Sequence, residues 1–113
     1  TKPNYDTKSV KSCEAQLEKQ KLPKRIMIDC SHGNTNKDYT LQPKVADNCI
    51  NQVLKSNQSI IGFMLESNIE EGNQKITPDL NDLKYGVSLT DACINWQSTE
   101  KLLLRLAEKL RKR

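Results

Sequence analysis

Two side chains with metal-binding chemistry follow two apolar segments of strand length. His32 comes shortly after the run 25–29, and Glu66 directly follows the run 59–65. In parallel α/β folds, side chains at the carboxyl ends of neighbouring strands project into one common mouth. A neutral imidazole beside carboxylates suits Mn²⁺, Fe²⁺ or Zn²⁺. The spacing therefore points to a divalent metal site, with a solvent-facing turn histidine and a solvated loop glutamate as the competing interpretation.

Three further residues are candidates for the same site. Asp91 follows the long polar loop, where the chain comes back towards the strand ends. Helix capping and the helix dipole also favour an acidic residue at such a position. Cys30 and His32 form a Cys-x-His pair, which is unspecific without a second such pair. Asp29 either orients the imidazole of His32 or is a strand-end carboxylate hydrogen-bonded to backbone. The residues alone leave these alternatives open.

Helical periodicity of the apolar residues marks three segments that would position these side chains. The predicted helices cover residues 7–19, 43–54 and 98–113. Pro43 stands near the first turn of the second helix, where proline is tolerated. Ser98 or Thr99 is available to cap the third helix.

The two strand-length runs lie between these helices. The run 59–65 is continuously apolar, which predicts a parallel strand buried on both faces. Residues 66–88 form a polar stretch with two glycines and a proline, and loops this long are often functional. The order helix, strand, helix, strand, long loop, helix indicates an α/β fold with a parallel sheet. Two strands leave both faces and both edges uncovered, so either partner strands lie in other sequence or the chain folds differently.

Composition and charge exclude several classes of protein. No segment approaches the roughly 20 apolar residues of a membrane span, and the first residues lack the apolar core of a signal peptide. The four cysteines are scattered without a CxxC pair. They are expected to be free thiols, with one disulfide pair as the alternative. We therefore expect a cytoplasmic protein without a membrane partner.

The net charge of +4 is concentrated at the C-terminal end. The basic residues there are Lys101, Arg105, Lys109, Arg111, Lys112 and Arg113. Cations near the end of a helix complement its dipole, and aromatic residues for base stacking are not interleaved with them. We expect no nucleic-acid partner, and a small basic nucleic-acid-binding module is retained as an alternative that needs salt-sensitive binding and no role for His32.

Several motifs together resemble a known family. They read Met27-Ile-Asp-Cys-Ser-His-Gly-Asn34, Ile60-Ile-Gly-Phe-Met-Leu-Glu-Ser67 continuing to Glu71-Gly-Asn-Gln74, and Tyr85-Gly-Val-Ser-Leu-Thr-Asp-Ala-Cys-Ile-Asn-Trp96, with Pro3-Asn-Tyr5 before them. They are similar, in order and spacing, to 3-deoxy-7-phosphoheptulonate synthases of enteric bacteria and fungi. The similarity covers essentially the whole chain.

The resemblance implies a fold for the chain. These enzymes are (β/α)8 TIM barrels, which need about 200 residues or more. Residues 1–113 would then be the C-terminal portion of a barrel, holding the last two βα units and the preceding helix, and would not form a complete domain. His32 would follow strand seven, Glu66 strand eight, and Asp91 would lie in the loop before helix eight.

The resemblance also implies an activity and a set of ligands. The family condenses phosphoenolpyruvate with erythrose 4-phosphate and releases phosphate, the first step towards chorismate and the aromatic amino acids. Its divalent metal, Mn²⁺ or Fe²⁺ in our expectation, is held by a Cys, a His, a Glu and an Asp. The last three match His32, Glu66 and Asp91, and His32 is also expected to contact phosphoenolpyruvate as a catalytic residue.

The departures from the family pattern limit what the chain is expected to do alone. The family's Gly-Pro-Cys-Ser segment, which carries the Cys ligand, and the Arg-Gly-Gly motif that precedes Pro3 in relatives have no counterpart here. The remainder of the barrel is thus an expected partner, and the parent enzyme is expected to be a homo-oligomer. A catalytically inactive fragment is the alternative.

Overall fold

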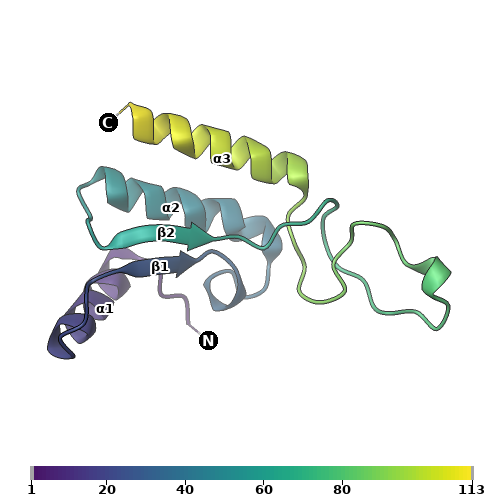
Figure 1. Ribbon diagram of the computed structural model, residues 1–113, viewed down its shortest axis with the longest axis horizontal. Coiled ribbons are helices and arrows are strands. Elements are labelled where there is room, and N and C mark those ends of the chain that lie inside the picture. Colours follow the sequence, from purple (N-terminus) through teal and green to yellow (C-terminus); the bar gives the residue numbers. More distant parts are fainter. Residues whose placement is uncertain (1, 113) are drawn as a thin grey trace.

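The computed structural model describes residues 2–112, so Thr1 and the predicted helix end at Arg113 lie outside the described residues. Its three helices and two strands are α1 (Thr7–Lys19), β1 (Ile26–Asp29), α2 (Gln42–Leu54), β2 (Ile60–Met64) and α3 (Trp96–Arg111). Short 3-10 turns cover His32–Asn34, Tyr39–Leu41 and Leu80–Asp82. The expected order of helices and strands is confirmed (Figure 1).

Local chemistry accounts for the ends of the helices. α1 begins after Asp6, whose carboxylate accepts a hydrogen bond from the Ser9 amide, and α2 has Pro43 in its first turn, as predicted. The prediction that Ser98 or Thr99 caps α3 is wrong. Asn95 has the extended backbone of an N-cap and accepts a hydrogen bond from the Ser98 amide at 2.8 Å, so the helix starts earlier than predicted.

The two strands are hydrogen-bonded neighbours and run parallel. Ile26 pairs with Ile60, and after a register shift Asp29 pairs with Met64. The amide of Cys30 donates to the carbonyl of Met64 at 2.9 Å, which extends the pairing by one residue. The two carboxyl ends therefore lie at the same edge of the sheet, so the residues that follow them emerge side by side.

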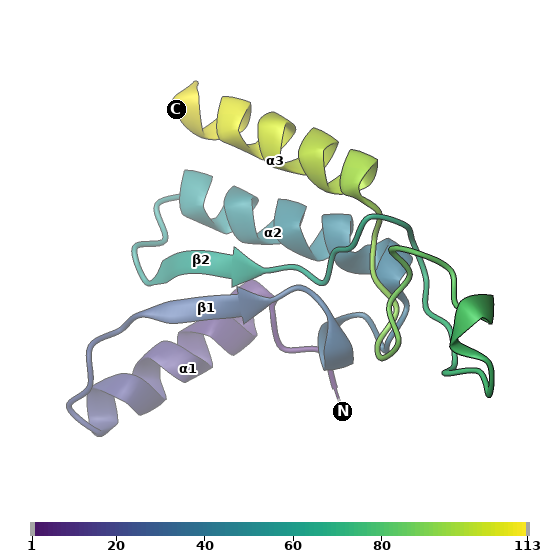
Figure 2. The same cartoon turned by 45° about the vertical axis from the view of Figure 1, so that its right-hand side comes forward.

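The helices pack around this strand pair. α2 lies between the strands and α3, and α1 lies along β1 on the other side from α2 (Figures 1 and 2). One apolar cluster draws on all five elements through Val10, Ile28, Cys30, Val45, Ala46, Cys49, Ile50, Ile60, Leu102 and Leu106. α2 and α3 are also joined by an ion pair between Asp47 and Arg105. A continuous core thus fixes the strand pair to its helices.

The sheet is only partly covered within this chain. Met27 of β1 and Ile61 of β2 each keep 63% of their surface exposed. The run 59–65 is therefore not buried on both faces by the described residues, because α1, α2 and α3 cover only part of the sheet surface, in agreement with the prediction that two strands alone leave faces uncovered. Apolar surface of this kind on a strand pair is suited to further strands or side chains of a larger sheet.

Residues 66–95 form an arm that extends away from the helices and strands (Figure 1). Isolated bridges tie it together, pairing Ser67 with Ile94 and Gly72 with Cys93 close to the strand ends. The long loop predicted between β2 and α3 is therefore ordered by its own backbone pairing. No helix among residues 2–112 has the length and apolar character needed to cross a membrane.

Candidate metal centre

His32 is held by Asp29 at the end of β1. The imidazole Nδ1 lies 2.9 Å from Asp29 Oδ2, while the other carboxylate oxygen accepts a hydrogen bond from the Ser31 amide at 2.8 Å. Both interpretations of Asp29 therefore hold, because its two oxygens serve the two roles separately. With Nδ1–H donating to Asp29, the lone pair of the neutral ring lies on Nε2.

Glu66 and Asp91 approach that second nitrogen. Nε2 of His32 lies 2.9 Å from Glu66 Oε1 and 3.3 Å from Asp91 Oδ2. One ligand atom from each of the three residues lies within 4.8 Å of the others. The three side chains that the sequence singled out are thus brought together from the β1 loop, the end of β2 and the 66–95 arm.

Glu66 is fixed by residues that the sequence did not single out. The hydroxyl of buried Ser31 donates to Glu66 Oε2 at 3.0 Å. The side chain of Gln42, at the start of α2, hydrogen-bonds both the amide and the carbonyl of Glu66. A serine in a polar loop and a glutamine at a helix start carry no local signal of such roles, because both are common surface residues.

Asp91 reaches the centre through pairing within the arm. Gly72 and Cys93 exchange two backbone hydrogen bonds of 2.9 and 3.1 Å, and the Asn73 side chain donates to the Thr90 carbonyl. Asp91 lies between these fixed points. It is not the cap of α3, which is Asn95, so the capping explanation of this carboxylate is wrong.

The carboxylates make the electrostatic potential at the centre negative. The pKa of His32 is raised by its hydrogen bond to Asp29 and by the charges of Asp29, Glu66 and Asp91, against a smaller effect of desolvation. Three carboxylates around one imidazole favour a positive charge at this place, which a proton or a metal cation supplies. An imidazole nitrogen with two carboxylates is a donor set that fits Mn²⁺, Fe²⁺ or Zn²⁺.

Cys30 has no place in this cluster. It is fully buried in the apolar core, and burial raises the pKa of its thiol to about 12. The Cys-x-His pair is therefore not a metal-binding pair in this geometry. All four cysteines are free thiols.

The cluster opens into a small hollow of about 90 Å³. The residues around it are Ser31, His32, Lys37, Glu66, Asn73, Asp91 and Ala92. Lys37 is a cation that the sequence analysis missed, because its neighbours in the sequence are ordinary loop residues. A positive charge beside the carboxylates of Glu66 and Asp91 gives the hollow groups for both a metal cation and an anionic substrate.

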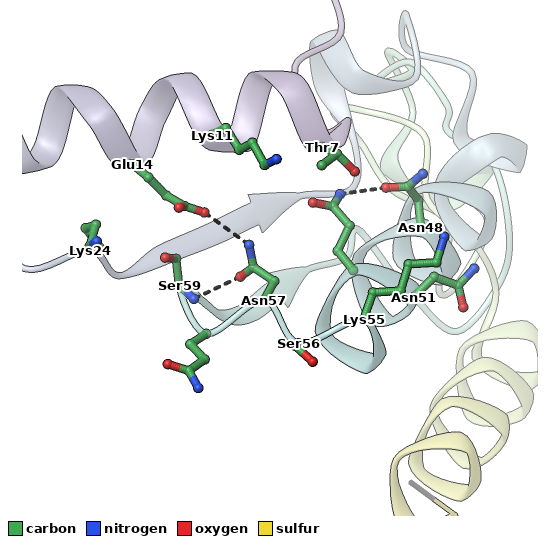
Figure 3. A pocket seen from close by; sticks show the side chains of 12 residues that line it. Thr7, Lys11, Glu14, Lys24, Asn48, Asn51, Lys55, Ser56, Asn57 and Ser59 are labelled. Atoms are coloured by element: carbon green, nitrogen blue, oxygen red, sulfur yellow. Dashed lines mark hydrogen bonds between the residues drawn. The ribbon is translucent and has the colours of Figure 1, made fainter.

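A larger hollow, of about 720 Å³, lies between α1 and the α2–β2 connection (Figure 3). Among the described residues that line it there is no histidine or cysteine. Its carboxylate, Glu14, accepts a hydrogen bond from Asn57, whose own side-chain oxygen accepts from the Ser59 amide. These polar groups hold the chain connections in place, and size alone does not make this hollow the site of chemistry.

Fold and cluster together define part of a parallel α/β protein with a candidate metal centre at the carboxyl ends of its strands. The family model described as DAHP synthetase I family matches residues 1–104, and the chain belongs to this family. DAHP is 3-deoxy-7-phosphoheptulonate, so the resemblance seen in the motifs is confirmed.

Individual relatives agree with the family match. The chain is 53% identical over 108 residues to the Tyr-sensitive phospho-2-dehydro-3-deoxyheptonate aldolase of Enterobacter agglomerans, covering 96% of this chain and 51% of the relative. It is 52% identical over 116 residues to the phenylalanine-inhibited enzyme of Saccharomyces cerevisiae, covering 97% and 31%. The chain therefore spans between about a third and a half of the length of these relatives.

A solved structure agrees as well. The phospho-2-dehydro-3-deoxyheptonate aldolase of Francisella tularensis SCHU S4 is 41% identical and superposes with a TM-score of 0.87. The match covers 95% of this chain and 30% of that one. The arrangement of helices and strands described above is thus similar to one part of a larger enzyme.

Proposed function

We propose that residues 1–113 form the C-terminal portion of a 3-deoxy-7-phosphoheptulonate synthase, which condenses phosphoenolpyruvate with erythrose 4-phosphate and releases phosphate. The observation that carries this proposal is the meeting of His32, Glu66 and Asp91 at the carboxyl ends of two adjacent parallel strands. In (β/α)8 barrels that edge holds the active site. Membership of the family supplies the reaction.

The uncovered sheet supports a barrel around this chain. β1 and β2 would be strands seven and eight, and α1 would be the helix before strand seven. The exposed side chains Met27 and Ile61 would then contact strands and helices supplied by the remainder of the barrel. We propose accordingly that the chain is not a complete domain by itself.

His32, Glu66 and Asp91 would hold a divalent metal ion, Mn²⁺ or Fe²⁺, with a fourth ligand from a Cys outside this chain. Such an ion supplies Lewis acidity at the aldehyde oxygen of erythrose 4-phosphate. Asp29 keeps the His32 imidazole in the tautomer that presents Nε2. His32 would also contact phosphoenolpyruvate, and Lys37 adds a positive charge at the hollow where an anionic substrate binds.

The basic end of α3 gives little support to the nucleic-acid alternative. Arg105 and Lys109 both pair with Asp47, and Lys112 pairs with Glu108. Three of the basic side chains at this end of the chain are therefore paired with acidic residues of the same chain. The homo-oligomeric state and the cytoplasmic location stay predictions.

The test is an assay of phosphate release from phosphoenolpyruvate and erythrose 4-phosphate with added Mn²⁺, on the full-length protein that contains this chain. Glu66→Ala is expected to lower turnover and Mn²⁺ affinity together, by about 10- to 100-fold or more. Lys112→Ala is the control and is expected to change neither. Normal turnover of Glu66→Ala would refute the assignment of Glu66, and absence of turnover in the unaltered full-length protein would refute the proposed activity.

A further inference from the structure

The strand pairing stops just before the metal centre. The last ladder hydrogen bond joins the Cys30 amide to the Met64 carbonyl, after which the chain turns away from β2 at Ser31. The peptide groups of Glu66 therefore have no partner on β1. Backbone amides and carbonyls at such a partly buried position need other hydrogen-bonding groups.

The side chain of Gln42 supplies the hydrogen-bonding groups that a neighbouring strand would otherwise provide to the Glu66 peptide. Its Oε1 accepts a hydrogen bond from the Glu66 amide at 2.7 Å, and its Nε2 donates to the Glu66 carbonyl at 3.0 Å. A carboxamide presents one acceptor and one donor side by side, as a strand neighbour would. Gln42 is fully buried, so water does not compete for these two hydrogen bonds.

The carbonyl of Glu66, which accepts the hydrogen bond from Gln42, also contacts the segment that bears Asp91. The Glu66 carbonyl also accepts a hydrogen bond from the Ile94 amide at 3.0 Å, and the Asn68 amide donates to the Ile94 carbonyl at 3.0 Å. Ile94 lies three residues after Asp91. The position of the Glu66 peptide therefore bears on two of the three candidate ligands, and Gln42 fixes that peptide from the helix side.

We propose that Gln42 is a positioning residue of the candidate metal centre, which fixes the backbone of Glu66 and thereby the placement of its carboxylate. This inference rests on the proposed function, in which Glu66 is a metal ligand. Both polar atoms of the Gln42 side chain are engaged with the main chain of Glu66, the oxygen with its amide and the nitrogen with its carbonyl. It acts through Glu66, so its effect on metal binding depends on the Glu66 carboxylate.

The chain offers a matched control on the same helix. Gln52 is also buried, and its Nε2 donates to the Tyr5 carbonyl and to Asn48 Oδ1, both at 2.7 Å. It lies ten residues further along α2, about 15 Å along the helix axis, in the wall of the larger hollow. Replacing either glutamine with methionine removes buried amide hydrogen bonds and nearly preserves the side-chain shape.

The experiment measures the dissociation constant of Mn²⁺ by electron paramagnetic resonance on the full-length protein. The variants are Gln42→Met, Gln52→Met, Glu66→Gln and the two double variants that combine Glu66→Gln with each methionine. We expect Gln42→Met to weaken Mn²⁺ binding by about tenfold or more, the size seen for outer partners of metal ligands, and Gln52→Met by less than about twofold. In the Glu66→Gln background the effect of Gln42→Met should largely disappear, because residues that act through one another are not additive.

The outcomes separate the two proposals. If Glu66→Gln leaves Mn²⁺ binding unchanged, the proposed metal centre itself is wrong. If Glu66→Gln weakens binding but Gln42→Met does no more than Gln52→Met, or adds its full effect to Glu66→Gln, the positioning role is overturned and the metal centre stands. Should Gln42→Met fail to fold, amide hydrogen exchange of the unaltered protein decides: a protected Glu66 amide supports the inference, and exchange at the rate of an exposed loop overturns it.

Discussion

Nδ1 of His32 lies 2.9 Å from Asp29 Oδ2, three residues earlier in the chain. This contact decides which nitrogen of the imidazole faces Glu66 and Asp91. It also concentrates negative charge behind the ring, which increases the basicity of the nitrogen on the far side. The proposed metal centre therefore depends on a carboxylate that offers it no ligand atom.

Asp29→Asn tests this dependence. The pKa of His32 is expected to fall towards its ordinary value of 6.5, because the variant removes the largest cause of its upward shift. Mn²⁺ affinity is expected to fall by about tenfold. The imidazole resonance of His32, assigned in the full-length protein by its loss in a His32→Gln variant, is followed by nuclear magnetic resonance as pH is varied. Asp38→Asn is the control, since that carboxylate caps the nearby turn at Thr40; equal shifts in both variants would contradict the role of Asp29.

Metal binding should weaken as pH falls. Protons and Mn²⁺ compete for Nε2 of His32. Because the pKa of His32 is raised, this competition begins at a pH above the ordinary pKa of histidine. Below that pKa, affinity is expected to drop by about tenfold for each pH unit, because one proton must leave for each ion bound. Titration of Mn²⁺ at a series of pH values measures the slope. An affinity that stays constant from about pH 8 to about pH 5 would be incompatible with a histidine ligand.

Asp47→Ala should loosen the contact between α2 and α3. Asp47 accepts hydrogen bonds from Arg105 at 2.6 and 3.1 Å and from Lys109 at 3.3 Å, and these partners lower the pKa of its carboxyl group. The expected loss is about 0.5–1 kcal/mol of unfolding free energy near neutral pH, since the pair is partly exposed. Urea unfolding measures it, with Glu108→Ala, which breaks the exposed pair with Lys112, as the control.

The pH dependence of this loss has a defined sign. A carboxyl group with a lowered folded-state pKa stabilises the fold above its unfolded-state pKa, and the stabilisation disappears as pH falls through the folded-state value. The difference in stability between the unaltered chain and Asp47→Ala should therefore shrink below the ordinary Asp value of 3.8. A difference that grows on acidification would show that Asp47 acts by some other means.

Gly86→Ala should disturb the arm more than Gly72→Ala. Both glycines have positive φ, but a Cβ at Gly86 would lie 2.8 Å from Cβ of Ile69, whereas the space at Gly72 is open. Each alanine is expected to cost about 1 kcal/mol for its left-handed backbone. Gly86→Ala should lose about 1–3 kcal/mol more from the forced contact. Urea unfolding and limited proteolysis of residues 66–95 compare the two variants, and equal losses would contradict the contact with Ile69.

The sequence by itself determined the elements and the candidate ligands. The bounds of α1, Thr7–Lys19, agree with the prediction, and both strands lie inside the apolar runs 25–29 and 59–65. Helical and strand periodicities are set by neighbours a few residues apart, so a local pattern suffices to find them. The family motifs added which of the polar residues belong together.

Only the tertiary structure decided how those residues meet. His32 and Glu66 come within 2.9 Å because of the register of β1 on β2, and Asp91 joins them through the pairing of Gly72 with Cys93. The periodicity of apolar residues predicts that a side chain is buried, but it does not show which other residues cover it. The same reason explains why Gln42 was missed and why Ile61, in a continuously apolar run, is exposed within this chain: hydrogen bonds and covering layers come from residues far away in the sequence, and their positions follow from packing.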